Sequence, residues 1–242
     1  MKEERFFFVP DASHAEELPD SEAQHALRVL RLHEGDDIYL MDGKGCFYHA
    51  EITLAASRKC RYNLLEVLPQ QPLWRGHIHL AVAPTKMMER MEWMVEKAVE
   101  IGVDEISFLD CDFSERRQLR VDRIEKIVVA AMKQSRKPWS TKVNPMMPFN
   151  NFISTARPGQ KYVAHCYTEV PRVDYFNTLM DRSSDQSSDI TILIGPEGDF
   201  SIGEVNDALN QGYHSVSLGN SRLRTETACV VAVTEARLAN RL

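Results

Sequence analysis

The first 70 residues alternate apolar and polar positions in short runs, a pattern typical of half-buried β-strands. Three such runs are expected to be strands: 36–41, 46–52 and 61–68. The turn between the first two contains Gly43 and Gly45, so these runs predict a β-hairpin. Over Ser21–Leu32 the apolar residues instead recur three or four positions apart, which predicts a helix. This part of the chain is therefore expected to form a small β-barrel with one helix.

From Trp74 onward, strand-like and helix-like segments alternate along the chain. The expected strands are 78–83, 105–109, 161–166, 190–194 and 215–218. The expected helices are 87–101, 121–134, 173–182, 202–210 and 225–241. This alternation predicts an α/β domain whose mainly parallel sheet is covered by helices on both faces.

Two segments without periodicity mark the organisation of the chain. Pro69–Pro72 interrupts the strand pattern and is interpreted as a linker, so we expect one domain over 1–70 and a second over 73–242. The polar stretch Ser183–Asp189 is expected to be an exposed loop.

Composition limits the class of protein. Of 242 residues, 43% are apolar and 26% charged, as in an ordinary folded protein. The longest unbroken apolar stretches, Ala228–Val233 and 127–132, have six residues each, against the roughly 18 that a membrane-spanning helix needs. Acidic residues precede the short Phe6–Val9 run, which argues against a signal peptide. Five cysteines without a CxxC pair argue against a zinc ribbon or a disulfide framework, and we expect reduced thiols in the cytoplasm.

Charge is unevenly distributed along the chain. The formal net charge is −6, of which residues 1–72, with 8 basic and 13 acidic side chains, account for −5. Residues 116–142 hold nine basic and two acidic side chains, a local net charge of +7. Such a segment is either a surface that binds phosphate groups or a solvated helix face, and the charge count alone favours neither.

One candidate site follows the expected strand 190–194. Its loop, Gly195-Pro196-Glu197-Gly198, precedes a helix that Ser201 would cap. Glycines allow close backbone approach, and ligands of open α/β sheets bind at the carboxyl ends of strands. The alternative is an ordinary strand-to-helix turn.

A second candidate site follows the strand 215–218. Gly219 opens its loop, and the following helix starts with Thr225-Glu226-Thr227. Helix capping and the helix dipole explain Thr225 and Glu226. They do not explain Arg222 and Arg224 just before a positive helix end, so we expect these arginines to face an anion.

Several chemistries are excluded by their missing motifs. The chain lacks the spacing of a P-loop, of a GxGxxG dinucleotide fingerprint and of a GxSxG nucleophile elbow. Its eight histidines do not combine with carboxylates in metal-ligand spacing, so no metal is expected.

Together the two loops resemble the 16S ribosomal RNA uridine-N3 methyltransferase family, ribosomal small-subunit methyltransferase E, of the SPOUT class of knotted S-adenosylmethionine enzymes. The most specific match is 195–198 combined with Leu-Arg-Thr-Glu-Thr-Ala at 223–228. Further matching segments cover most of the chain: 25–31, 34–36, Lys86, Glu89, Arg90, 95–103 and 132–136. The chain departs from the family at Asp199, where a second glycine is common, and at 220–222, where Pro-Arg-Ile is common.

The resemblance implies an architecture and a reaction. The barrel would be of the RNA-binding PUA type, and the α/β domain would hold a trefoil knot with the cofactor site near a homodimer interface. The reaction would be methylation of a uridine of 16S ribosomal RNA at N3 by S-adenosylmethionine, on the assembled small ribosomal subunit in the cytoplasm.

The resemblance also implies site residues. Backbone and side chains around the cofactor would come from Ile194, Gly195, Pro196, Glu197, Gly198, Leu218, Gly219, Leu223, Thr225, Thr227 and Ala228. The residues that would contact RNA are Arg31, Lys86, Arg90, Arg116, Lys133, Arg136 and Arg222.

Methylation at N3 requires loss of a proton, and negative charge then spreads onto both uracil oxygens. Our hypothesis is that Arg224 stabilises this charge and that Glu226 or Glu197 accepts the proton. For Glu226 the alternative is a carboxylate that only satisfies amides of the first helical turn.

Two other functions remain compatible with the sequence. One is a non-catalytic RNA-binding or ribosome-assembly factor that keeps the fold without the transfer. The other is a knotted methyltransferase that acts on another base or on tRNA, because base selection depends on pocket shape.

Overall fold

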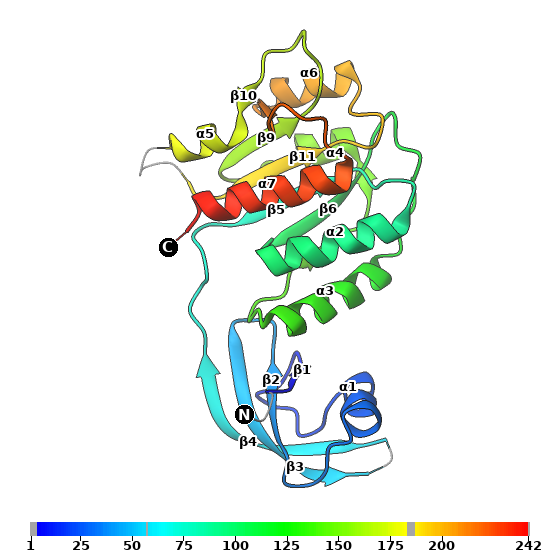
Figure 1. Ribbon diagram of the computed structural model, residues 1–242, viewed down its shortest axis with the longest axis vertical. Coiled ribbons are helices and arrows are strands. Elements are labelled where there is room, and N and C mark those ends of the chain that lie inside the picture. The colour runs from blue at the N-terminus through cyan, green and yellow to red at the C-terminus, as the bar shows by residue number, and fades with distance from the viewer. Residues whose placement is uncertain (1–3, 57, 183–186, 242) are drawn as a thin grey trace. The chain divides into compact units, whose positions relative to one another are not determined.

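The computed structural model describes residues 4–56, 58–182 and 187–241, which divide into two compact units (Figure 1). The first comprises Met1–Pro72 and Val129–Ser140, and the second Leu73–Val128 and Thr141–Leu242. The end of helix α3 (Val121–Ser135) therefore belongs to the first unit. No helix within the described ranges is long and apolar enough to cross a membrane.

The first unit is built on a four-stranded sheet in the order β1-β2-β3-β4. Its strands are β1 (Phe6–Phe8), β2 (Asp37–Met41), β3 (Cys46–Ala55) and β4 (Cys60–Pro69). The hairpin predicted between β2 and β3 is confirmed, and its turn is closed by Asp42, whose Oδ1 accepts from the backbone N–H of Lys44 at 2.7 Å and of Cys46 at 3.1 Å. A bridge between Glu17 and Arg61 adds to the sheet, while closure into a barrel stays a prediction.

The predicted helix 21–32 is shorter and less regular than its apolar spacing indicated. It consists of α1 (Asp20–Gln24) and a π-helical turn, η1 (His25–Val29), with Ala23 and Ala26 fully buried. The wide turn is closed by the N–H of Leu30, which donates to the carbonyl of His25. The segment ends at Arg31, whose φ of 52° is incompatible with continuing a right-handed helix.

The second unit contains the predicted parallel sheet, in the order β10-β12-β9-β11-β5-β6-β7, with β8 beside β6. Its strands are β5 (Ile78–Val82), β6 (Glu105–Asp110), β7 (Lys142–Val143), β8 (Met147–Pro148), β9 (Gln160–Ala164), β10 (Val173–Asp174), β11 (Ile190–Ile194) and β12 (His214–Ser217). Every residue of β5 and β11 is buried, as expected for strands covered on both faces.

The helices form two layers. Helices α2 (Met88–Ile101), α5 (Tyr175–Met180) and α7 (Thr225–Ala239) pack together on one face of the sheet (Figure 1). Helices α4 (Phe149–Ser154) and α6 (Ile202–Asn210) pack together on the other face. The fold is thus α/β, as predicted. Of the predicted loop Ser183–Asp189, Ser183–Gln186 lie outside the described residues, and Ser187 is exposed.

A buried polar cluster lies at the amino ends of β5 and β6. His79 is 6% exposed, and its Nε2 lies 2.8 Å from Oγ of Ser107. Burial lowers the pKa of His79 to about 4, and the nearby carboxylate of Glu105 opposes this only in part. The imidazole is therefore neutral in the folded protein at neutral pH.

This cluster predicts a loss of stability in acid. Below about pH 6.5 the unfolded chain takes up a proton at His79 that the folded protein does not bind, so the free energy of unfolding decreases down to about pH 4. The contribution of His79 to this decrease in the free energy of unfolding is on the order of 1–3 kcal/mol. We expect it to be absent in His79→Asn when urea unfolding is measured at several pH values between about 6.5 and 4. The half-exposed His77 provides the matched control, His77→Asn. An unchanged pH dependence in His79→Asn would contradict the prediction.

Candidate functional site

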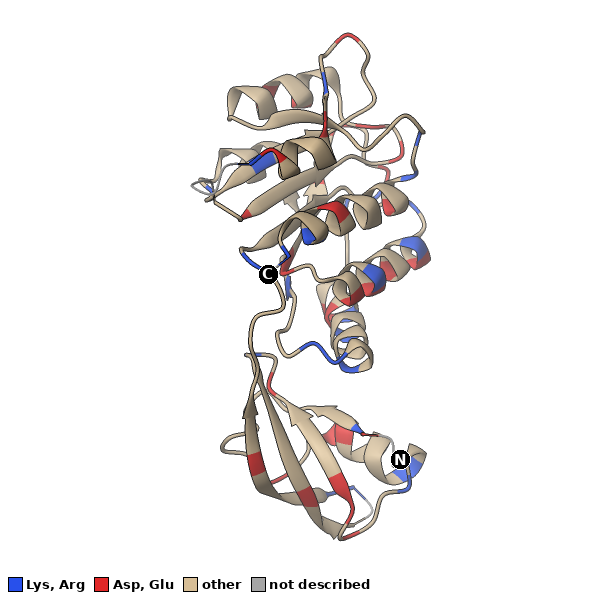
Figure 2. Cartoon of the chain, turned by 60° about the vertical axis from the view of Figure 1, so that its left-hand side comes forward, with Lys and Arg blue, Asp and Glu red and all other residues tan. Residues whose placement is uncertain are grey.

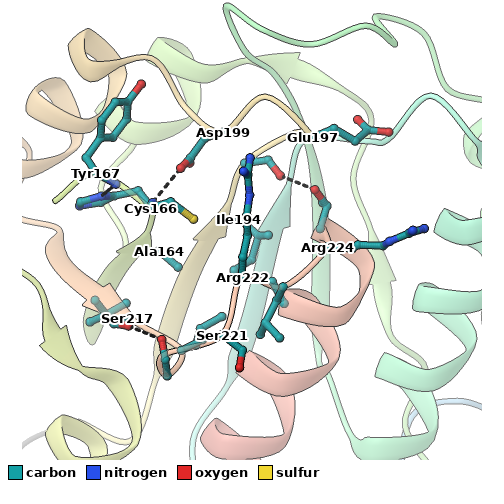
Figure 3. A pocket seen from close by; sticks show the side chains of 18 of the residues that line it. Ala164, Cys166, Tyr167, Ile194, Glu197, Asp199, Ser217, Ser221, Arg222 and Arg224 are labelled. Atoms are coloured by element: carbon teal, nitrogen blue, oxygen red, sulfur yellow. Dashed lines mark hydrogen bonds between the residues drawn. The ribbon is translucent and has the colours of Figure 1, made fainter.

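A cavity of about 1070 Å³ lies in the second unit, where the carboxyl ends of three parallel strands meet the start of α7 (Figure 3). Its walls are the segments that follow β9, β11 and β12, together with single residues of neighbouring elements. Those segments are 164–169, 194–199 and 216–226, with Ala228, Arg90 and Arg172 beside them. Both loops that the sequence singled out therefore line the same cavity.

Gly195 makes the tight turn after β11 possible. A Cβ atom at this position would lie 2.9 Å from the backbone nitrogen of Phe200 and 3.1 Å from the carbonyl carbon of Asp199. Backbone atoms cannot move aside as the end of a flexible side chain can, so the turn requires glycine. The hydroxyl of Thr225 donates to the carbonyl oxygen of Gly195 at 3.1 Å and ties the start of α7 to this turn.

Asp199 has a structural role that glycine could not fill. Its φ of 68° lies in the left-handed region, which aspartate tolerates better than most residues. Its carboxylate accepts a hydrogen bond from the backbone N–H of Cys166 at 2.7 Å (Figure 3) and a second one from the backbone N–H of Phe200 at 2.8 Å. The residue that departs from the family pattern thus links the loops after β9 and β11.

The loop after β9 is the part of the cavity that sequence reasoning missed. Tyr167 Oη donates to the carbonyl of Phe200 at 2.8 Å, and buried His165 places Nε2 2.6 Å from Oγ of Ser215. Burial lowers the pKa of His165. The available signal was topological: β9 lies beside β11 in a parallel sheet, so their carboxyl ends share one edge.

The two arginines of the loop before α7 line the cavity and are exposed. In Figure 3, Arg222 stands between Cys166 and Glu197, whereas Arg224 points away from Cys166. Arg224 occupies the N-cap position of α7 without a capping hydrogen bond from its side chain. Both guanidinium groups thus lie near the positive end of a helix and are placed to meet an anion.

Glu226 is a buried carboxylate in the wall of the cavity. It is 8% exposed, and its Oε1 lies 3.5 Å from Nη1 of Arg90 on α2. A buried carboxylate is costly without a partner, and Arg90 supplies a positive one. The structure therefore places Arg90 against Glu226 at the cavity.

Glu197 connects the loop after β11 to the segment after β5. Its side chain is exposed, and Oε1 accepts from the backbone N–H of Lys86 at 3.0 Å. Arg116 holds the same segment from the other side by donating to the carbonyls of Thr85 at 3.2 Å and Lys86 at 2.6 Å. Lys86 Nζ in turn lies 3.0 Å from Oε2 of Glu115.

Three predicted RNA-contacting residues lie in the first unit. Arg31 is exposed. Lys133 Nζ lies 2.7 Å from Oε1 of Glu22. Nη1 of Arg136 lies 2.6 Å from Oε2 of Glu4. Its guanidinium carbon, Cζ, lies over the ring of Phe6, 5.1 Å from the ring centroid.

Much of the basic run 116–142 is paired with acidic side chains. The pairs within the second unit are Arg117–Asp110, Arg120–Asp122, Arg123–Glu92 and Lys142–Glu105. Figure 2 shows further acidic segments along the strands of the first unit. Asp122 is already counted in the local charge of +7, and that charge is partly compensated by acidic residues outside the run, among them Asp110, Glu92 and Glu105.

Among the described residues, the predicted cofactor-binding set is brought together with one exception. Thr227 lies on α7 but does not line the cavity. The predicted catalytic residues Arg224, Glu226 and Glu197 all line it, as do Arg90 and Arg222.

Comparison with known families and proteins places these observations in context. Residues 72–237 match a family model described as an RNA methyltransferase domain, and 18–61 match an RNA methyltransferase PUA domain. The ribosomal RNA small subunit methyltransferase E of Rickettsia conorii is 26% identical, over 98% of this chain and 96% of that protein. The protein of the same name from Bacillus subtilis is 24% identical, over 95% and 94%.

Solved structures agree over nearly the whole chain. A probable rRNA-methyltransferase from Porphyromonas gingivalis is 42% identical with a TM-score of 0.89, covering 98% of both chains. A ribosomal RNA small subunit methyltransferase E from Neisseria gonorrhoeae bound to S-adenosyl methionine is 25% identical with a TM-score of 0.83, covering 96% of this chain and 95% of that one.

The turn at Gly195 generates a stability prediction. In Gly195→Ala the new Cβ meets backbone atoms, so we expect the free energy of unfolding to fall by about 1–3 kcal/mol in denaturant titrations. Gly203→Ala is the matched control, because a Cβ there lies 3.7 Å from its nearest neighbour, Ser201 Oγ, inside helix α6. The control is expected to be neutral or more stable by up to about 1 kcal/mol. Equal stabilities of the two variants would show that the turn does not require glycine.

Proposed function

The chain belongs to the RNA methyltransferase family that includes the ribosomal RNA small subunit methyltransferases E, and we propose that it methylates N3 of a uridine in 16S ribosomal RNA with S-adenosylmethionine as methyl donor. The single observation that carries the proposal is the cavity in which both glycine loops and the first turn of α7 converge. The reaction needs the methyl donor, the target uracil and a proton acceptor in one place, and the convergence of these segments provides such a place.

The cavity fits S-adenosylmethionine. Its volume of about 1070 Å³ is slightly above the ~300–1000 Å³ typical of ligand sites, which leaves room for a target base beside the cofactor. The backbone at Gly219 has open space where a Cβ atom would lie and allows close approach, and Ile194 and Leu218 supply apolar surface for an adenine ring. The positive end of α7, which opens into the cavity at Thr225, suits the carboxylate of the amino acid moiety.

The chemical step requires a proton acceptor at the uracil ring. When bound, S-adenosylmethionine supplies a methyl group from its positively charged sulfur. Glu226 accepts the N3 proton, the electron pair of that N–H bond forms the new bond to the methyl carbon, and the electron pair of the broken carbon–sulfur bond stays on sulfur. Arg224 stabilises the charge on the uracil oxygens, a contribution typically of about 3 kcal/mol to the transition state.

Glu226 suits the role of base better than Glu197. The Glu226 carboxylate is held in the cavity wall and oriented by Arg90 at 3.5 Å. One oxygen of Glu197 is engaged by the N–H of Lys86, a contact that fixes the loop. Glu197 therefore acts as a positioning residue, and Arg90 orients the base.

The remaining parts of the proposal concern the RNA and the assembly. Residues 1–70 form a PUA-like RNA-binding barrel and 73–242 the methyltransferase domain. The residues that contact RNA phosphates are Arg31, Lys86, Arg116, Lys133, Arg136 and Arg222. The protein acts as a cytoplasmic homodimer on the small ribosomal subunit.

A trefoil knot in the methyltransferase domain is part of the proposal. After β12, the chain has to pass the carboxyl ends of β9 and β11 before α7 packs on α2 and β5. The bond from Thr225 to the Gly195 carbonyl holds this passage in place. The strand order and this contact support the knot.

The proposed function predicts which product forms. Labelled S-adenosylmethionine is expected to transfer its methyl group to undermethylated small subunits and, more slowly, to naked 16S RNA, and nucleoside analysis is expected to find the label in 3-methyluridine. Label in another nucleoside would overturn the position of transfer. Cofactor binding without transfer to either substrate would point to another RNA, and absence of cofactor binding would favour a non-catalytic assembly factor.

The role of Glu226 gives a second prediction. Glu226→Gln keeps a hydrogen-bond acceptor for Arg90 but removes the base, so kcat is expected to fall by about 100-fold or more. Its dissociation constant for S-adenosylmethionine, measured by calorimetry, is expected to stay within about twofold of wild type. Glu197→Gln is the matched control and is expected to retain kcat within about tenfold. Near-normal turnover of Glu226→Gln would exclude Glu226 as the base.

A further inference from the structure

Phe113 is an exposed aromatic residue for which the proposed reaction has so far no use. It lies between β6 and α3, and its side chain is 51% exposed. A single exposed apolar side chain is common on folded proteins, so a role for Phe113 depends on what surrounds it.

The backbone around Phe113 is held firmly. On one side, the N–H of Asp112 donates to Oε1 of Glu204 at 2.9 Å, and Oδ2 of Asp112 accepts from Ser201 Oγ at 2.7 Å. On the other side, Ser114 is buried and its Oγ accepts from the N–H of Cys111 at 3.0 Å. The ring is thus exposed to solvent on a fixed backbone. Binding of a ligand to the ring therefore costs little conformational entropy of this loop.

Phe113 lies at the edge of the cofactor cavity. A Cβ atom on Gly198, which lines that cavity, would lie 3.2 Å from Cβ and 3.8 Å from Cγ of Phe113. Arg117, which pairs with Asp110, also donates from Nη2 to the carbonyl of Asp112 at 3.1 Å, one residue before Phe113. An exposed aromatic ring and an arginine therefore lie on the same loop, which contacts Gly198 at the edge of the cavity.

We propose that Phe113 stacks against an unpaired nucleobase of the RNA substrate while Arg117 lies near the adjoining phosphate. The inference rests on the proposed function. In a base-paired uridine the N3–H is engaged with the partner base, so the methylated base must be unpaired, and unpaired bases are commonly held by aromatic side chains. A phenyl ring has no hydrogen-bonding group and every nucleobase has a π-face, so any of the bases can stack on the ring.

The test compares Phe113→Leu, which removes the aromatic face, with Phe113→Tyr, which keeps it. Dissociation constants are measured without turnover for naked 16S RNA, for single-stranded oligouridine and for an RNA duplex. Phe113→Leu is expected to weaken binding of the two RNAs with unpaired bases by about 5- to 100-fold, the range for loss of one stacked base, and to leave duplex binding unchanged. Phe113→Tyr is expected to stay within about twofold of wild type for all three.

Two further measurements separate the alternatives. Thermal unfolding and calorimetry with S-adenosylmethionine are expected to give wild-type values for both variants, because Phe113 is exposed and its backbone contacts are unchanged. Equal RNA affinities of wild type and Phe113→Leu would overturn the proposal. Loss of a dimer in Phe113→Leu, measured by light scattering, would also overturn it, because Phe113 would then contact a second protein chain and not RNA. A wild-type protein that binds RNA but transfers no methyl group would overturn the proposed function and leave the stacking result valid.

Discussion

The close approach of the backbone at Gly195 is the constraint on which the cavity depends. Strand β11 is buried on both faces, so the chain must leave its end in a tight turn over Phe200. The turn exposes the carbonyl of Gly195 toward α7, where Thr225 donates to it. This one contact sets the start of α7 and, with it, the positions of Arg224 and Glu226. A larger residue at position 195 would displace all of them together.

Carboxylates that accept backbone N–H groups hold the remaining loops at this edge of the sheet. Parallel strands share ladder hydrogen bonds only along their length, and beyond their ends each loop needs other partners. Asp199 binds the N–H of Cys166, Glu197 that of Lys86, and Glu204 that of Asp112. The first two links each join two loops that are distant in sequence, and the third joins a loop to the first turn of α6. These three acidic side chains therefore have a structural purpose, whereas Glu226 pairs with the side chain of Arg90.

Periodicity in the sequence was sufficient for the long elements and insufficient for the short ones. The buried strands and the helices α2, α3, α6 and α7 follow from runs long enough to show a period. Helix α4 has six residues and the strands β7, β8 and β10 two each, too few for a period to be visible. The two glycine loops were found by their motifs. The loop at Cys166 has no motif, and its place in the cavity follows from the order of strands in the sheet.

The paired basic residues bear on how an acidic protein binds RNA. Lys133 already contacts Glu22, and Arg123 already contacts Glu92. A phosphate that approaches such a cation also meets its carboxylate partner, so each contact gains less Coulomb energy, and releases fewer counterions, than one made by an unpaired cation. Binding must then depend more on terms that do not involve charge. Stacking of an unpaired base on Phe113 is such a term, and it acts only where the base is exposed beside the methyl donor.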